Sequence, residues 1–362
     1  MNSLSTLFFP NDSKKYHIKS LDGLRGLAVL LVLLSHSSLL GLKFLPFLSF
    51  EYTGTYGVYL FFVLSAYLLD KQICRAFVDG NSGTKFWINY FLRRFLRIYP
   101  LFFVAVIFNY FLFVSEYSIY SIPISKEDIP PHLLMVYGKH IFWSIPVEFK
   151  YYFLSPLIVF VAYKYLNFDN GKTLIFFIGL VFLSLALSYL RVLGYFGTVS
   201  YFPIFLAGTF LAIIETNSNV MQAVRKWIDF LTIISLLIIV LTSKVIWKDL
   251  LHFEQFPFHG LKFYTLYGVC WGFLLAKVLN GGRNFITILF EFKALRFLGN
   301  ISFSAYLWHI PVLYFTTKSG FFDPGYGVYL FFTGTILISS ISYFVIEYPL
   351  SKVKLRYNQS TK

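Results

Sequence analysis

Charged side chains are scarce in this sequence. Asp, Glu, Lys and Arg together make up 13% of its 362 residues, roughly half the share found in soluble globular domains. Hydrophobic residues make up 57% of the chain and aromatic residues 22%. This composition predicts an integral membrane protein and excludes an ordinary soluble one.

Cysteine is also scarce, because the chain contains only Cys74 and Cys270. Two cysteines are too few for a disulfide framework, and their separation does not match the spacing of metal ligands. We therefore expect no redox chemistry and no metal site.

Long apolar windows dominate the rest of the sequence, and ten of them are long enough to cross about 30 Å of hydrocarbon. They cover residues 23–41, 53–70, 98–115, 142–163, 173–190, 199–214, 228–244, 263–278, 298–316 and 327–346. The first window is not a signal peptide, since nine more follow and no small-residue cleavage pattern stands after it. We expect an all-α integral membrane protein with about ten transmembrane helices, one membrane domain over residues 1–362 and no fused soluble domain.

The basic residues between these windows predict the orientation. Most of the 31 lysines and arginines lie on the cytoplasmic side if the N-terminus is cytoplasmic, as the positive-inside rule requires. The N-terminal segment 1–20 and the tail 351–362 are then both cytoplasmic. The net charge of +14 faces anionic lipid headgroups or an anionic soluble ligand, so no nucleic-acid partner is needed.

A few ionisable residues interrupt the apolar windows. Arg25 and His36 are eleven residues apart, which places them on one face of a helix with a rise of about 16 Å between them. An ionisable residue inside a membrane helix usually faces a cavity or a polar partner. His36 is therefore a candidate functional residue, with a structural histidine as the alternative; for Arg25, interfacial anchoring and ligand binding remain equally open.

Two later segments bring ionisable residues to a similar expected depth. Ser144 and Glu148 share one face of the helix that enters the membrane after residue 140, and His309 lies about three turns into the helix after residue 297. A carboxylate beside an imidazole commonly orients a general base. The alternative is a buried polar network that only holds the helices together.

Arg94 and Arg97 lie one helical turn apart in "FLRRFLRIYP". Guanidinium groups at this spacing suit the binding of phosphates. Anchoring of the helix at the cytoplasmic interface explains them nearly as well.

Several segments, in order along the chain, resemble the signatures of the membrane-bound acyltransferase type 3 family. They are "LDGLRGLAVLLVLLSHS" (21–37), "GVYLFFVLSAYLLD" (57–70), "FLRRFLRIYP" (91–100), "FWSIPVEFKYYFLSP" (142–156) and "LGNISFSAYLWHIPV" (298–312). The chain departs from the pattern at Phe149, where the family often has a second acid after Glu148. A mechanism that needs two carboxylates at this point is therefore in doubt.

The resemblance implies an enzyme of the bacterial inner membrane. It implies transfer of an acyl group, usually acetyl, from a cytoplasmic acyl-CoA to a hydroxyl of a cell-envelope carbohydrate such as O-antigen, capsule or exopolysaccharide, either free or lipid-linked. By this resemblance the residues divide into catalytic His36 and Glu148, acyl-CoA-binding Arg25, Arg94 and Arg97, and substrate-binding Trp143, Ser144, Tyr306 and His309.

In this scheme His36 removes the proton of the acceptor hydroxyl and Glu148 steadies the imidazolium. We favour direct transfer over an acyl-enzyme, because nothing in the sequence resembles a strained nucleophile turn. One rival function is a transporter of a glycan or lipid-linked intermediate that performs no acyl transfer. Another is a sensor or scaffold that binds lipid without catalysis.

Overall fold

A computed structural model describes most of the chain. It covers residues 17–45, 47–190, 198–216, 218–253, 261–280, 284–319 and 324–353, together with Phe9, Asp12, Phe258 and Gly282. Most of the expected cytoplasmic segments 1–20 and 351–362 therefore lie outside the described residues.

The described residues are mainly helical and contain no strand, apart from an isolated bridge between Leu45 and Leu48. The longer helices are α2 (Lys19–Leu39), α3 (Gly54–Val78), α4 (Thr84–Val114), α6 (Ser144–Lys164), α7 (Asn170–Tyr189), α8 (Thr198–Ile214), α9 (Ser218–Leu241), α10 (Leu261–Leu279), α13 (Ser302–Lys318) and α14 (Pro324–Ser342). The shorter helices are η1 (Ser118–Tyr120), η2 (Lys126–Asp128), α5 (Ile129–Leu133), η3 (His140–Trp143), η4 (Val245–Leu250), α11 (Phe285–Phe290), α12 (Lys293–Asn300), η5 (Tyr343–Glu347) and α15 (Tyr348–Ser351).

The helical architecture expected of a membrane protein is confirmed. Within the described residues, six helical segments are long and apolar enough to span a membrane, and two shorter apolar helices, Thr198–Ile214 and Phe263–Leu279, accompany them. Helices satisfy their own backbone hydrogen bonds, which is the condition for crossing hydrocarbon. The number of ten spans and the cytoplasmic placement of both termini stay predictions.

The connection between α3 and α4 is shorter than expected. The expected apolar windows end at residue 70 and resume at residue 98, but α3 continues to Val78 and α4 begins at Thr84. Gly80 ends α3 in a left-handed conformation (φ +66°), as the "DGNSG" turn signal predicts. Arg94 and Arg97 therefore lie well inside α4 and not at its mouth.

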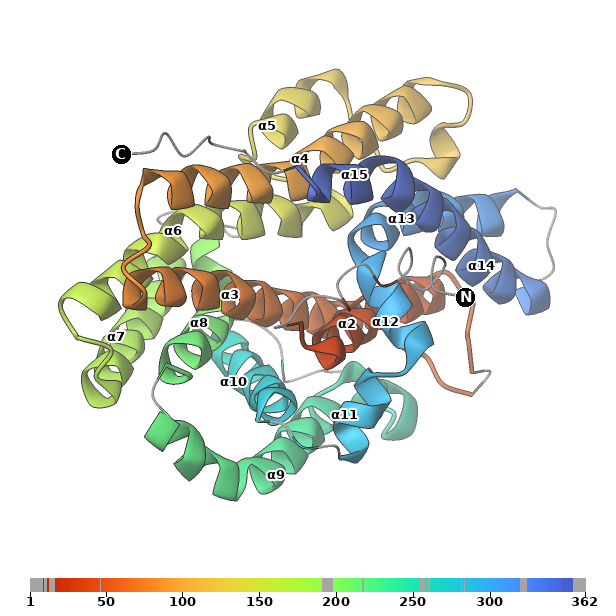
Figure 1. The fold of residues 1–362 in the computed structure, drawn as a ribbon. Helices are drawn as coiled ribbons and strands as arrows, with labels where there is room; N and C mark the ends of the chain where they lie inside the picture. The colour runs from red at the N-terminus through yellow and green to blue at the C-terminus, as the bar shows by residue number, and fades with distance from the viewer. Residues whose placement is uncertain are drawn as a thin grey trace.

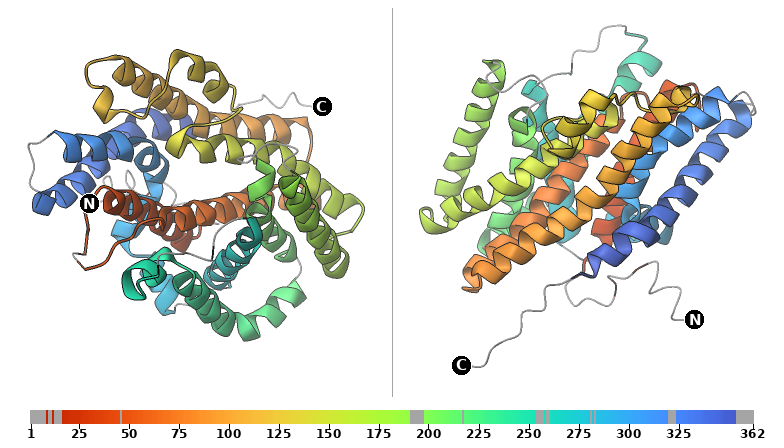
Figure 2. Two further views of the ribbon diagram at one scale, coloured as in Figure 1. Left: turned by 180° about the vertical axis from the view of Figure 1, so that it is seen from behind. Right: turned by 90° about the horizontal axis from the view of Figure 1, so that it is seen from above.

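The centre of the bundle is formed by α2 and α3, which cross next to each other in Figure 1. Helix α2 packs against α12 and α13 on one side, while α3 packs against α6, α8 and α10 on the other. In Figure 2, α4 runs along the outside of the bundle next to α6. We call the end of the bundle where α3 turns into α4 the α3–α4 end.

The contact between α2 and α12 depends on glycine. A Cβ atom added at Gly299 would lie 1.8 Å from the carbonyl oxygen of Asp22, and one at Gly26 would lie 1.9 Å from that of Leu295. Backbones that approach this closely exclude any larger residue. The glycines therefore fix the position of α2 relative to the segment that leads into α13.

Candidate active site

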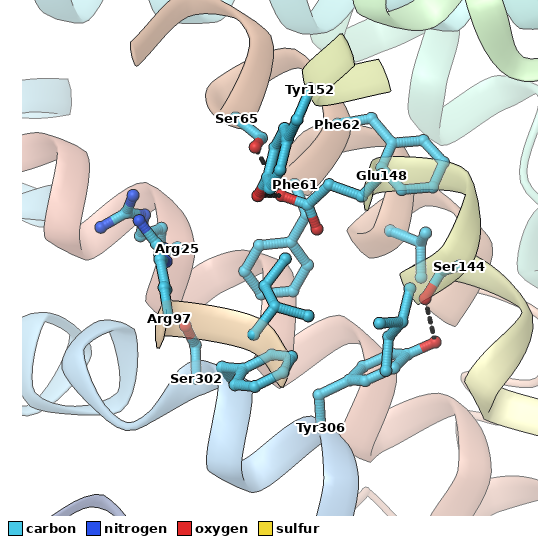
Figure 3. Close-up of a pocket in the computed structure, with 14 residues that line it drawn as sticks. Arg25, Phe61, Phe62, Ser65, Arg97, Ser144, Glu148, Tyr152, Ser302 and Tyr306 are labelled. Carbon is cyan, nitrogen blue, oxygen red and sulfur yellow. Dashed lines mark hydrogen bonds between the residues drawn. The ribbon is translucent and has the colours of Figure 1, made fainter. Parts of the chain in front are cut away.

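A narrow cavity of about 60 Å³ lies between α2, α3, α4, α6 and α13. Its polar lining residues are Arg25, Ser65, Arg97, Ser144, Glu148, Tyr152, Ser302 and Tyr306. Figure 3 shows Arg25 and Arg97 together on one side of it, while Ser144 and Tyr306 lie on the other. Cations and a hydroxyl pair thus line one cavity between the helices.

The basic side of the cavity combines two helices. Arg25 comes from the first two turns of α2, and Arg97 comes from α4 and is exposed. Arg94 does not line this cavity: its guanidinium lies 5.9 Å from the ring centre of Tyr90 and 6.0 Å from that of Tyr152, and it borders two neighbouring pockets at the α3–α4 end. The structure therefore separates the two arginines that the sequence placed in one binding role.

Glu148 is held from two helices. Its carboxylate accepts hydrogen bonds from Ser65 of α3 at 2.5 Å and from Tyr152 of α6 at 2.7 Å. Figure 3 shows these two bonds at the wall of the cavity. They leave the carboxylate inside the cavity and fix its orientation relative to Arg25 and Arg97.

The opposite wall is built by a hydrogen-bonded corner. The Ser144 hydroxyl donates to the Tyr306 hydroxyl at 2.8 Å, and Tyr306 donates in turn to the backbone oxygen of Ile141 at 2.6 Å. These bonds tie the first residue of α6, and the short η3 helix before it, to α13. Both side chains are buried.

Next to this corner, the structure brings His36 and His309 into direct contact. Nε2 of His309 lies 3.3 Å from Nδ1 of His36, and the two ring centres are 4.9 Å apart. The ring of His309 also lies 5.9 Å from that of Tyr306, while His140 lies 6.4 Å from His36. His309 is fully buried, His36 is partly buried and His140 is exposed.

One expected pairing in the site is wrong, and one residue predicted to bind substrate lies outside the cavity lining. Glu148 is not the partner of His36, because its hydrogen bonds go to Ser65 and Tyr152 and the imidazole instead contacts His309. Trp143 does not line the cavity: its ring packs on Phe62 at 6.0 Å and on Tyr201 at 4.6 Å. An expected similar depth in the membrane therefore did not determine which of these side chains contact each other.

Three residues of the site escaped the sequence interpretation. Ser65 and Ser302 line the cavity, and His140 faces the histidine pair. A signal existed for Ser65, because it is a polar residue within the apolar run "LFFVLSAYLL". Serine is common in membrane helices, however, where it can bond to its own helix.

The connection from α4 to α6 is ordered by its own polar network. Nε2 of His132 accepts the backbone N–H of Lys139 at 2.9 Å, and Nδ1 donates to the backbone oxygen of Asp128 at 2.7 Å. Burial lowers the pKa of His132. Desolvation acts to raise the pKa of Asp128, but hydrogen bonds from Lys139 and Ser125 outweigh it and lower that pKa.

Comparison with known proteins gives the family. A model of the family described as "Acyltransferase domain" matches residues 18–345, which is most of the chain. The chain belongs to this acyltransferase family. The resemblance seen in the sequence motifs is therefore confirmed. The members of this family are acyltransferases.

Curated relatives of this family member are O-acetyltransferases. The peptidoglycan O-acetyltransferase OatA of Listeria monocytogenes serovar 1/2a (strain ATCC BAA-679 / EGD-e) is 28% identical over 377 residues, covering 94% of this chain and 56% of its own length. The O-acetyltransferase OatA of Staphylococcus aureus (strain NCTC 8325 / PS 47) is 26% identical over 376 residues, covering 93% and 57%. The acyltransferase chain thus spans little more than half the length of these relatives. No solved structure matches it.

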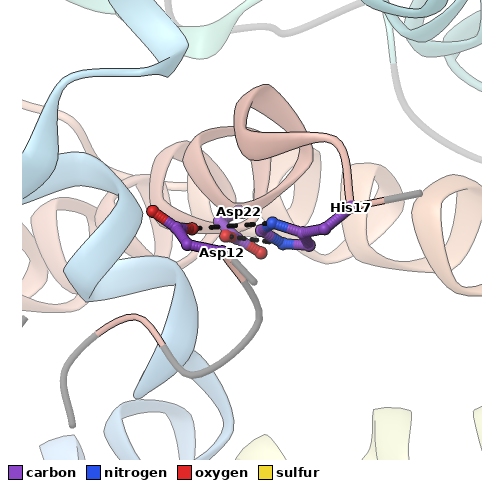
Figure 4. A group of neighbouring side chains, drawn as sticks. All are labelled: Asp12, His17 and Asp22. Carbon is purple, nitrogen blue, oxygen red and sulfur yellow. Dashed lines mark ion pairs between the residues drawn. The ribbon is translucent and has the colours of Figure 1, made fainter. Parts of the chain in front are cut away.

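One group of residues in this acyltransferase has the geometry of metal ligands. Among the described residues, ligand atoms of Asp12, His17 and Asp22 lie within 4.8 Å of one another. Figure 4 shows these three side chains pointing toward one another. The guanidinium of Arg296 pairs with both carboxylates. Lys19 also pairs with Asp12, so two cations face the two carboxylates, and we interpret the group as an ion-pair network that ties Asp12 to α2 and α12.

Proposed function

We propose that this protein transfers an acyl group, most simply acetyl, from cytoplasmic acyl-CoA to a hydroxyl of a cell-envelope carbohydrate at the outer side of the bacterial inner membrane. The observation that carries the proposal is the cavity, which holds guanidinium groups on one side and the Ser144–Tyr306 pair on the other. The histidine pair lies directly behind Tyr306. The proposal includes ten membrane spans with both termini in the cytoplasm.

The basic side of the cavity suits the phosphates of the donor. Arg25 and Arg97 offer guanidinium forks to phosphate oxygens, and Arg94 borders the pockets next to them. The rise along α2 from Arg25 to His36 is about 16 Å. An extended pantetheine arm has a similar length, so phosphates bound at Arg25 let the thioester reach the level of the histidines.

The chemistry requires one base. In our proposal, Nε2 of His36 takes the proton of the acceptor hydroxyl while the hydroxyl oxygen attacks the thioester carbonyl. The carbon–sulfur bond then breaks, and the departing CoA sulfur receives the proton from the imidazolium. The fixed carboxylate of Glu148 lines the cavity together with Arg25 and Arg97 and balances part of their charge, whereas His36 and His309 are not among the lining residues and lie next to Tyr306.

Trp143, Ser144, Tyr306 and His309 were assigned to substrate binding from the resemblance. The structure supports Ser144 and Tyr306 as part of the cavity wall, whereas Trp143 lies behind it against Tyr201. For the acceptor, the name of the Listeria relative points to peptidoglycan. We propose a cell-envelope polymer of this carbohydrate class, with O-antigen, capsule or exopolysaccharide as further candidates.

The test uses purified protein in proteoliposomes, with radiolabelled acetyl-CoA outside and peptidoglycan fragments trapped inside. We expect release of CoA outside and labelled ester on the glycan inside, with neither in vesicles that lack protein. A second preparation with trapped O-polysaccharide defines the acceptor class. Passage of glycan through the membrane without consumption of acetyl-CoA would instead support a transporter.

A further inference from the structure

The hydrogen bonds of His309 determine which of its nitrogens carries a proton. Nδ1 of His309 lies 2.8 Å from the backbone oxygen of Tyr306 and 3.2 Å from that of Ala305. Carbonyl oxygens only accept hydrogen bonds. Nδ1 of His309 must therefore be the protonated nitrogen, and in the neutral ring Nε2 then carries a lone pair.

This assignment passes to His36 through the contact between the rings. Nε2 of His309 can only accept, so Nδ1 of His36, 3.3 Å away, must donate to it. The backbone oxygen of Val32 lies 3.0 Å from the same Nδ1 and also requires a donor. Both neighbours therefore place the proton of neutral His36 on Nδ1 and leave its Nε2 unprotonated.

We propose that His309 is a positioning residue that fixes the Nδ1–H tautomer of His36 and so presents Nε2 as the base. This inference rests on the proposed function for its role in catalysis, but the tautomer itself does not. His309 then performs, as a neutral group, the orienting task that a carboxylate performs in a catalytic triad. It takes over the task that the sequence interpretation gave to Glu148.

The surroundings of His36 fit this role. The titratable groups that face it are His309 from α13 and His140 from η3, while Glu148 is bound by Ser65 and Tyr152. When Nε2 of His36 takes a proton, the bond from its Nδ1–H to His309 becomes charge-assisted and stronger. The proton taken from the hydroxyl is on Nε2 of His36, the ring nitrogen that does not contact His309, so the leaving group can take it.

The direct test is nitrogen NMR of the full-length protein labelled with ¹⁵N-histidine. Protonated and unprotonated imidazole nitrogens resonate in separate ranges, and the signals of His36 are assigned by their loss in His36→Gln. At a pH where His36 is neutral, we expect a protonated Nδ1 and an unprotonated Nε2. A protonated Nε2 in the wild-type protein overturns the inference, and this readout needs neither substrate nor activity.

Two variants of similar size separate positioning from packing. His309→Gln keeps an acceptor close to the position of Nε2, whereas His309→Leu removes it. In the Leu variant only the Val32 oxygen still accepts from Nδ1 of His36. We expect this variant to shift His36 partly toward the Nε2–H tautomer and to lose about 10²- to 10⁴-fold in kcat with little change in KM for acetyl-CoA. The Gln variant should keep the Nδ1–H tautomer and stay within about tenfold of wild type, and the exposed His252→Gln serves as the histidine control.

The outcomes distinguish this inference from the proposed function. An Nδ1–H tautomer that is lost in His309→Leu and kept in His309→Gln supports the inference even if acetyl-CoA is never consumed. Unchanged His36 signals in a folded His309→Leu protein overturn the inference even if acyl transfer is observed. If His309→Leu fails to fold, a protonated Nε2 in the wild type or loss of the Nδ1–H tautomer in His309→Gln still overturns the inference.

Discussion

Replacing Tyr306 with Phe tests whether α13 holds the corner before α6. The lost hydroxyl donates to the backbone oxygen of Ile141 and accepts from Ser144, and both of these residues are buried. A buried polar group left without its partner costs about 1–3 kcal/mol, although hydrogen bonds between membrane helices contribute only about 0.6 kcal/mol on average. We expect the free energy of unfolding to fall by about 1–3 kcal/mol.

The assay is reversible unfolding by SDS in mixed micelles, followed by tryptophan fluorescence. A double-mutant cycle with Ser144→Ala isolates the bond between the two hydroxyls, for which we expect a coupling free energy of about 0.6 kcal/mol. Tyr314→Phe, on the same helix and outside the cavity lining, is the control. A Tyr306→Phe protein as stable as this control would refute the reasoning.

Three further predictions follow from separate parts of the structure. Gly299→Ala places a Cβ atom 1.8 Å from the Asp22 carbonyl oxygen, so we expect a loss of stability of about 1–3 kcal/mol. The loss should be visible as a lower melting temperature in detergent. An unchanged melting temperature would contradict the close approach of α2 and α12. Arg97→Gln should raise KM for acetyl-CoA about 10- to 100-fold, because a charge-assisted bond contributes about 1.5–3 kcal/mol. The exposed Arg93→Gln should change this KM little. An equal rise of KM in both variants would argue for a general charge effect. Because burial lowers the pKa of His132, its contribution to stability is present above its unfolded pKa of about 6.5 and is lost as the pH falls. Intrinsic amide exchange itself slows as the pH falls, so the readout is the protection factor, which should decrease for residues 126–139 between pH 7 and 5 in the wild type. The same decrease in His132→Gln would exclude this histidine as the cause.

Much of the helical framework could be predicted from the sequence, because apolar length is a strong signal in a membrane chain. The boundaries of α3 and α4 were less accessible. Both helices continue beyond the apolar windows into the segment 71–97, where basic and aromatic residues alternate. Hydropathy measures where a chain meets hydrocarbon, and a helix can continue beyond that limit.

Some residues of the candidate site could be singled out from the sequence, but their pairings could not. Ionisable residues in apolar helices are costly, and this rule alone identified His36, Glu148 and His309. Which of them touch depends on the rotation of each helix and on which helices are neighbours. Those are set by packing such as the glycine contact of α2 with α12, which a single sequence does not reveal.

The central claim is that this chain transfers an acyl group from acyl-CoA with His36 as the base, and release of CoA is its most direct test. Wild type, His36→Gln and the exposed control His252→Gln are compared in proteoliposomes with acetyl-CoA and peptidoglycan fragments. We expect CoA release and ester formation by wild type and the control, and a loss of at least about 100-fold in folded His36→Gln. Equal rates in all three proteins would contradict the role of His36, and no consumption of acetyl-CoA or longer acyl-CoAs by wild type would contradict acyl transfer itself.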